Sequence, residues 1–133
     1  MNASPTDRAR VLPLIIGPLM AAAGFALWTT FAVAPLVAGG RLREAWDIET
    51  YWIIGLPLLL LAQAAAGFFS QASPWRLALW CAAGHFLAAL IIVPSGTSFS
   101  MLPFALVFIG LPMFAALTFA AFIGRWLGRM VME

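Results

Sequence analysis

The chain has 133 residues, of which 64% are hydrophobic and only 9% are charged, and its formal net charge is +2. Soluble domains carry about 25% charged residues, so this composition excludes an ordinary soluble enzyme or binding domain and makes lipid the expected solvent. All seven basic residues are arginines that flank apolar runs. Because they form no basic stripe, we expect no nucleic-acid partner.

Four stretches are long and apolar enough to cross a bilayer, which takes about 20 helical residues. A polar segment, 1–10, precedes the first stretch, and a short tail, 127–133, follows the last. The uncharged run 77–124 is too long for one helix and is divided by the turn-forming sequence Pro-Ser-Gly-Thr-Ser at 94–98. The expected spans, which together form one transmembrane domain over residues 11–126, are 11–38, 51–69, 75–93 and 101–124.

The short connections between these spans favour an antiparallel arrangement of neighbouring helices. We therefore predict an all-α membrane protein with four transmembrane helices in an up-and-down bundle. The first apolar run, 11–40, is much longer than the core of a signal peptide, about 7–15 residues. It is expected to remain as a span.

The arginines predict the orientation of the bundle. Five of them fall on the side that holds both termini: Arg8, Arg10, Arg76, Arg125 and Arg129. The opposite side has only Arg41 and Arg43. Since cytoplasmic loops are enriched in basic residues, we expect both termini to face the cytoplasm, in a bacterial cytoplasmic membrane, with the lipid bilayer as the first partner.

The connection 39–50 is the one substantial polar loop, and its acidic side chains are Glu44, Asp47 and Glu49. Arg43 and Asp47 are four residues apart and would pair across one turn of a short interfacial helix. Two interpretations stay open for the acidic cluster: a vestibule that attracts cations, or a solvated loop with local ion pairs. Next to it, Trp46, Tyr51 and Trp52 are expected at the headgroup level.

The sequence Ile-Gly-Leu-Pro occurs twice, at 54–57 and 109–112. Proline lacks a backbone donor and clashes with the preceding helical turn, but within a membrane protein neighbouring groups can satisfy the freed carbonyl. We therefore predict matched helix bends in the second and fourth spans, at Gly55, Pro57, Gly110 and Pro112.

These matched segments, with Ala-Ala-Gly at 22–24 and again at 82–84, favour two repeated helical hairpins. Such repeats, related by an axis along the membrane normal, occur in transporters. The other explanation is that Ala, Gly, Leu and Pro recur by chance in membrane helices, as Ala-Ala-Gly at 65–67 illustrates.

Few polar side chains lie deep in the predicted spans, and each is a candidate for function because burial in lipid is costly. Gln63 and His85 are predicted at similar depths and within reach of a hydrogen bond, and Thr118 lies in the fourth span. His85 has two interpretations. It lines a pathway, for example as a proton relay, or it is a packing histidine bonded to Gln63 or to a backbone carbonyl.

The sequence gives no support for catalysis or for a bound cofactor. A single histidine excludes bis-histidine haem ligation within one protomer, and no spacing of metal-ligating residues occurs in the spans. No nucleophile and base can be assembled, and Cys81 is expected to behave as a small hydrophobe. We predict no catalytic residue, no metal, no cofactor and no enzymatic activity.

Two functional classes remain. The first is an oligomeric transporter or channel for a small neutral or lipophilic solute, because a four-helix unit encloses little volume and carries almost no buried charge. The alternative is a non-catalytic accessory or assembly subunit of a larger membrane complex. The expected protein partners are accordingly other copies of the chain or other membrane subunits.

Overall fold

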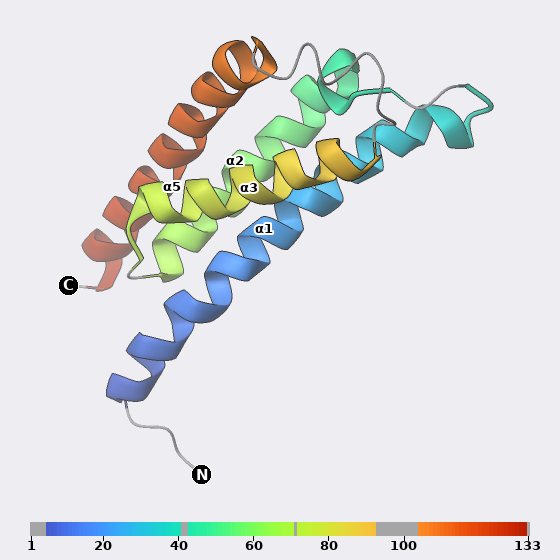
Figure 1. Ribbon diagram of the computed structural model, residues 1–133. Coiled ribbons are helices and arrows are strands. Elements are labelled where there is room, and N and C mark those ends of the chain that lie inside the picture. Colours follow the sequence, from blue (N-terminus) through green and yellow to red (C-terminus); the bar gives the residue numbers. More distant parts are fainter. Residues whose placement is uncertain (1–4, 41–42, 71, 93–103, 133) are drawn as a thin grey trace.

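The computed structural model of the protein describes residues 5–40, 43–70, 72–92 and 104–132. All regular secondary structure in this part of the chain is helical (Figure 1). The elements in order are α1 (Pro5–Val37), η1 (Ala45–Asp47), η2 (Tyr51–Gly55), α2 (Leu56–Phe69), α3 (Pro74–Ile92), η3 (Leu106–Gly110) and α5 (Leu111–Met132).

Four helices are long and apolar enough to cross a membrane, and they cover Leu14–Val37, Tyr51–Phe69, Pro74–Ile92 and Leu106–Val131. The four predicted spans are therefore confirmed, and the chain is a small integral membrane protein. The fourth helix extends farther toward the C-terminus than its predicted end at 124. The predicted turn at 94–98 lies outside the described residues.

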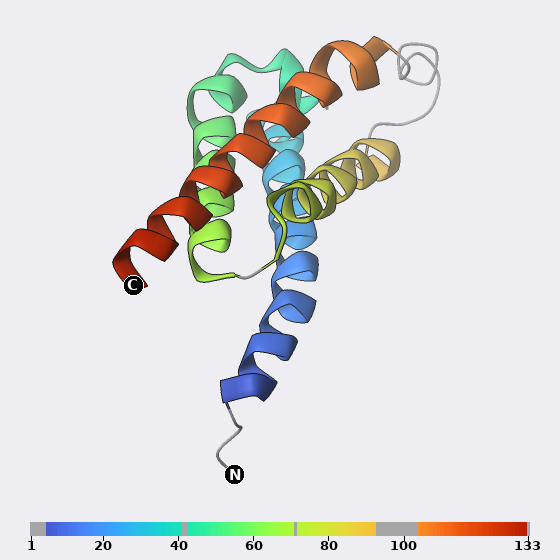
Figure 2. The same ribbon diagram turned by 90° about the vertical axis from the view of Figure 1, so that its left-hand side faces the viewer.

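The four helices pack in the predicted up-and-down order, with consecutive spans in opposite directions (Figures 1 and 2). The most extensive packing, however, joins helices that are next but one in sequence: α1 packs on α3, and α2 packs on α5. Because directions alternate along the chain, each of these pairs contains two helices that run the same way. Short connections set the order of the helices, but they do not set which faces meet.

Glycines allow α1 and α3 to touch through their backbones. A Cβ atom on Gly84 would overlap the carbonyl group of Ala21, and one on Gly24 would overlap the carbonyl oxygen of Cys81. The two contacts are reciprocal: Ala21 lies three positions before Gly24, and Cys81 lies three positions before Gly84. Such close approach through small residues is typical of membrane helix pairs, and it permits Cα–H to carbonyl contacts.

The same arrangement joins α2 to α5. A Cβ atom on Gly67 would overlap the carbonyl group of Ala121, and one on Gly124 would overlap that of Ala64. Again each glycine faces the carbonyl three residues before its counterpart. The two helix pairs therefore share one contact motif, in which a small residue is followed by a glycine three positions later on all four helices.

Both Ile-Gly-Leu-Pro segments have the same local structure. Each is preceded by a π-helical turn, η2 or η3, that ends at the glycine of the motif. The turns close through hydrogen bonds from the N–H of Leu56 to Tyr51 and from the N–H of Leu111 to Leu106. A π turn inserts one residue into a helix, so the chain enters each proline without leaving the helical path. At both positions where bends were predicted, the helix has a wide π turn.

The glycine and the proline of each Ile-Gly-Leu-Pro segment lie in different surroundings. Pro57 and Pro112 are exposed, whereas Gly55 and Gly110 are buried. A Cβ atom on Gly55 would lie 2.9 Å from the ring of Phe31, and one on Gly110 would lie 2.8 Å from the ring of Phe86. Within each helical hairpin, a phenylalanine of the first span thus packs on the glycine of the second.

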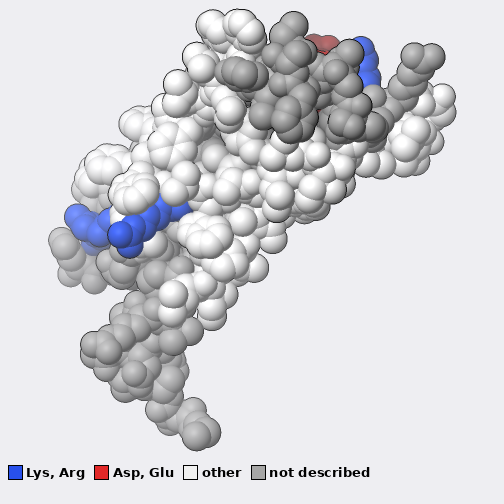
Figure 3. All heavy atoms as spheres, viewed as in Figure 1, with Lys and Arg blue, Asp and Glu red and all other residues white. Residues whose placement is uncertain are grey.

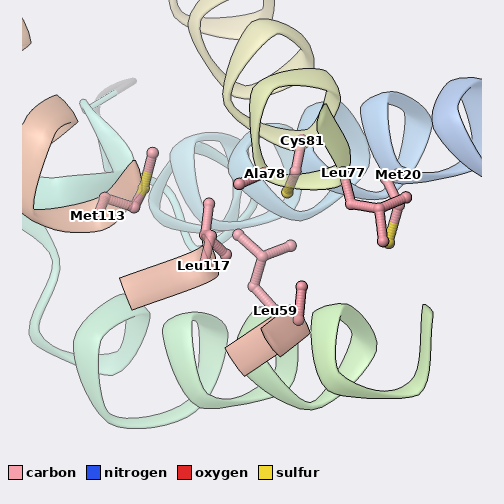
Figure 4. Packing of buried hydrophobic residues seen from close by; sticks show 8 residues of the cluster. Met20, Leu59, Leu77, Ala78, Cys81, Met113 and Leu117 are labelled. Atoms are coloured by element: carbon pink, nitrogen blue, oxygen red, sulfur yellow. The ribbon is translucent and has the colours of Figure 1, made fainter. Parts of the chain in front are cut away.

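A hydrophobic cluster fills the space between the two helix pairs (Figure 4). All four spans contribute to it, and its buried members are Met20, Leu59, Leu77, Ala78, Cys81, Met113, Leu117 and Ala121. Cys81 is a free, buried thiol, as its place among apolar residues predicts.

The α1 to α3 contact makes a direct prediction for stability. Gly84→Ala places a methyl group against the backbone of α1, and overpacking of this kind costs about 1–3 kcal/mol. Reversible unfolding of the purified protein in SDS–detergent mixed micelles measures the loss. The matched control is Ala83→Val on the exposed face of the same turn, for which we expect a change below about 0.5 kcal/mol. Equal stability of the two variants would show that the close backbone contact is not needed.

Candidate functional site

The bundle has two ends with different chemistry. We call the end that holds the connection 43–50 the loop end, and the end that holds the α2–α3 connection and the close of α5 the terminal end (Figure 1). The predicted polar residues fall at different levels between them. Gln63 and His85 are fully buried, while Thr118 is half-buried and donates a hydrogen bond to the carbonyl of Phe114 in its own helix, at 2.8 Å.

His85 has hydrogen-bonding partners on two other elements. Its Nδ1 lies 3.2 Å from the carbonyl oxygen of Gly24 in α1, and its Nε2 lies 2.8 Å from the hydroxyl oxygen of Tyr51 in η2. A carbonyl oxygen only accepts, so Nδ1 carries the proton of the neutral ring and Nε2 accepts from the tyrosine. A neutral ring is also the form that burial in a membrane protein favours.

The Tyr51 hydroxyl joins this group to the fourth span, because it lies 3.7 Å from the sulfur of Met113 in α5. Tyr51, His85, Gly24 and Met113 come from four different spans. We call them the polar junction. It is the point at which all four spans meet through polar or polarisable atoms.

The predicted hydrogen bond between Gln63 and His85 is not formed, and that prediction is wrong. Gln63 donates from Nε2 to the carbonyl oxygen of Leu77, at 3.1 Å, instead. Measured from the α2–α3 connection, His85 lies about one and a half helical turns deeper than Gln63. The other interpretation of His85, a packing histidine bonded to a backbone carbonyl, describes the geometry that is present.

Aromatic rings cover the polar junction at the loop end. The ring centroid of Trp46 lies 6.4 Å from that of His85 and 5.7 Å from that of Trp28, which it meets edge-on. Phe31 meets Tyr51 edge-on at 5.8 Å. We call Trp28, Phe31, Trp46 and Tyr51 the aromatic closure. Edge-to-face contacts of this kind add about 0.5–1.5 kcal/mol each beyond the area that they bury.

The connection 43–50 folds back over the bundle and carries Trp46 into the closure. Its helix is only the three-residue turn η1, and Glu44 before it is extended, with φ −66° and ψ 138°. Arg43 and Asp47 therefore do not face each other across one helical turn, contrary to the prediction. The Glu44 carboxylate accepts a hydrogen bond from the indole N–H of Trp46, whereas Asp47 and Glu49 are exposed.

Two polar atoms in this region have no hydrogen-bonding partner among the described residues. They are the indole N–H of Trp28 and the side-chain oxygen of Gln63, both buried. Buried polar atoms are nearly always bonded in native proteins. Trp28 in the aromatic closure therefore has one hydrogen-bond donor without a partner among the described residues, and Gln63 has one such acceptor.

A pocket opens between α1 and α3 at the terminal end. The glycine contact separates this pocket from the aromatic closure at the loop end. Its volume is about 390 Å³, and it is lined by Leu14, Gly17, Pro18, Ala72, Ser73, Arg76, Leu77 and Trp80. The Trp80 ring forms one wall, and it packs so closely on α1 that a Cβ atom on Gly17 would lie 2.7 Å from the indole nitrogen. We call this space the α1–α3 pocket.

The sequence identified His85 but missed its partner. Tyr51 follows Trp46 and precedes Trp52, so the pattern placed all three at the headgroup level, yet Tyr51 is fully buried and Trp52 is exposed. One signal for Tyr51 was available in the sequence, because Tyr51 begins the segment that leads to Pro57. A wide helical turn before this proline rotates the side chains of the segment to other faces of the helix.

The described side chains contain no group of three or more His, Cys, Asp or Glu residues that could hold a metal ion. His85 and Tyr51 are the titratable pair within hydrogen-bonding distance inside the spans. Their buried position suits proton donation and acceptance between helices, and it offers no open face to a reacting molecule.

Comparison of the chain with family models, with curated proteins and with solved structures found no match.

The polar junction predicts a measurable coupling between two side chains. In a double-mutant cycle of Tyr51→Phe and His85→Phe, unfolding free energies in mixed micelles should give a coupling of about 0.5–1.5 kcal/mol, since hydrogen bonds between membrane helices fall in this range. The same cycle with Gln63→Leu and His85→Phe should give less than about 0.3 kcal/mol, because the two residues share no bond. A larger coupling for Gln63 than for Tyr51 would contradict the observed geometry.

Proposed function

We propose that the protein is a membrane carrier for a small neutral or lipophilic solute. One observation carries the proposal: α1 and α3 touch backbone to backbone at Gly24 and Gly84, with an open pocket on one side of this contact and the packed aromatic closure on the other. A carrier needs a site that opens to one side of the membrane while the other side is closed. The two helices visibly cross one another (Figure 2).

The lining of the α1–α3 pocket supports a solute of this class. Its volume of about 390 Å³ lies within the range of small-molecule sites, about 300–1,000 Å³. Most of its walls are apolar, and its polar groups are the Ser73 hydroxyl and the Arg76 guanidinium. No carboxylate lines it, which disfavours a cationic solute.

The energetics of the loop end support a closure that opens. Opening it requires the hydrogen bond between Tyr51 and His85 to break and Trp46 to leave Trp28. A hydrogen bond between membrane helices averages about 0.6 kcal/mol, and the aromatic contact adds about 0.5–1.5 kcal/mol. A closed state favoured by a few kcal/mol leaves the open state populated at about 0.1–10%, which suits a carrier.

Movement about the glycine contact is the proposed conformational change. At the Gly24 and Gly84 contact the two backbones touch directly, and we propose that α1 and α3 change their angle there while the backbones stay together. As the loop end opens, the α1–α3 pocket narrows. The predicted oligomeric state and the predicted cytoplasmic orientation of the termini stay predictions in this scheme.

A flux assay tests the proposal. Proteoliposomes should exchange at least one of two radiolabelled neutral probes, glycerol or a short-chain alkylurea, faster than protein-free vesicles do. Trp80→Ala removes a wall of the pocket, and we expect about a five- to tenfold slower exchange, equivalent to the loss of one aromatic contact. Leu79→Ala is the control, because this exposed leucine of the same helix does not line the pocket.

No exchange of either probe, or equal rates for Trp80→Ala and Leu79→Ala, would contradict a carrier built on the α1–α3 pocket. Recovery of one stoichiometric membrane protein with the chain in mild detergent, together with absent flux, would favour the accessory-subunit alternative.

Cysteine labelling tests the proposed movement. Cys81 is the single cysteine, so Cys81→Ala gives a background without thiols. Ser73→Cys in the pocket should react quickly with a water-soluble maleimide, and Ala88→Cys, which is fully buried in the closure, should react slowly but measurably as the loop end opens. If Ala88→Cys stays unlabelled until the protein unfolds, the closure does not open and the proposed movement is wrong.

A further inference from the structure

A second pocket lies at the terminal end, between the start of α3 and the close of α5. Its volume is about 260 Å³, and it is lined by Pro74, Phe122, Arg125, Trp126 and Arg129. We propose that this pocket binds the phosphate group of an anionic phospholipid from the surrounding bilayer. None of the residues that line this pocket lines the α1–α3 pocket, and the inference does not rest on the carrier proposal.

The first argument is the state of Arg125. One guanidinium nitrogen, Nη1, donates to the carbonyl oxygen of Ala72 at 3.4 Å, whereas the buried Nε has no acceptor among the described residues. A guanidinium has five N–H donors in a fixed plane and binds a phosphate through two parallel hydrogen bonds. Arg125 is thus anchored at one atom and keeps donors for an anion.

The second argument is the local charge. Arg129 follows Arg125 by one helical turn, and like charges at this spacing repel each other. The three acidic side chains that the structure describes, Glu44, Asp47 and Glu49, all lie in the connection at the loop end. A bound phosphate would relieve the repulsion between the two arginines.

The arrangement of elements adds to this charge. The pocket includes Pro74, the first residue of the 19-residue helix α3, and the start of a helix carries positive potential. Figure 3 shows basic side chains gathered on one part of the surface, near the start of α3 and the close of α5. The pocket, whose lining is mostly apolar, thus brings two arginines and the start of a helix together at the terminal end.

The third argument concerns the source of the phosphate. Phe122 and Trp126 line the pocket and are more than half exposed, at 57% and 53%, and the neighbouring Phe119 and Ile123 are also exposed. This apolar strip of α5 faces lipid, so it offers an acyl chain a surface directly beside the arginines. Basic pockets between transmembrane helices bind anionic headgroups in this way, and tryptophans favour the headgroup level.

Native mass spectrometry of the full chain tests the proposal. The protein is equilibrated in mixed micelles with equal amounts of phosphatidylcholine and phosphatidylglycerol, and the retained lipids are counted. We expect a clear preference for phosphatidylglycerol in the wild type. Arg125→Gln and Arg129→Gln should each lower this preference about fivefold, the effect of one basic residue at a membrane surface.

Arg43→Gln is the matched control, because Arg43 is an exposed arginine at the loop end. It should leave the preference unchanged, and an equal loss for all three variants would show general charge attraction instead of a site. Circular dichroism and thermal unfolding confirm that each variant is folded. A variant that does not fold is replaced by the Arg→Lys substitution, which keeps the charge but not the planar fork and should lower the preference less.

Competition identifies the source of the phosphate. Excess inorganic phosphate or glycerol 3-phosphate should leave phosphatidylglycerol bound, since neither can use the apolar strip of α5. Displacement of the lipid by either soluble anion would overturn the proposal in favour of a site for free phosphate. Equal retention of phosphatidylcholine and phosphatidylglycerol by the wild type would overturn it altogether.

Discussion

The close backbone contact at the paired glycines is the constraint on which the rest of the molecule depends. In lipid, apolar side chains gain little by leaving their solvent, so helices associate through close packing. Here the motif of a small residue followed three positions later by glycine occurs on all four spans, and it joins α1 to α3 and α2 to α5. Since the helices of each pair run in the same direction and cross, they meet at one level and leave space at the others. That space holds the aromatic closure at the loop end and the α1–α3 pocket at the terminal end.

The polar junction belongs to this arrangement. With α1 and α3 in contact at Gly24 and Gly84, the carbonyl of Gly24 comes within reach of His85, which directly follows Gly84. The π turn before Pro57 then brings Tyr51 inward to the other ring nitrogen. Three features that look separate in the sequence, a glycine pair, a lone histidine and a repeated proline motif, therefore act on one small region. Its hydrogen bonds are weak individually, so the region orients the spans without locking them.

The sequence was sufficient for the spans, their order and the matched Ile-Gly-Leu-Pro segments, because hydropathy and proline chemistry are local. It was insufficient for the pairing of helices, because short connections limit distance along the chain but leave the contact faces open. The Ala-Ala-Gly triplets show this well. The one at 65–67 looked like chance recurrence, yet Gly67 forms the α2 to α5 contact just as Gly24 and Gly84 form the other. The Gln63 to His85 bond was mispredicted because, counted from the α2–α3 connection, His85 lies about one and a half helical turns deeper than Gln63. Tyr51 was missed because a π turn changes which way a side chain points.

The most direct test of this account is a carbon–carbon correlation measurement by solid-state NMR on the protein in lipid bilayers. The sample carries ¹³C at the glycine Cα atoms and at the alanine carbonyls. The account predicts cross peaks that join Gly84 to Ala21 and Gly124 to Ala64, because in each pair the two backbones are in contact. The peaks should persist when labelled protein is diluted with unlabelled protein, since both contacts lie within one chain. Absence of both peaks, or their loss on dilution, would contradict the pairing of α1 with α3 and of α2 with α5.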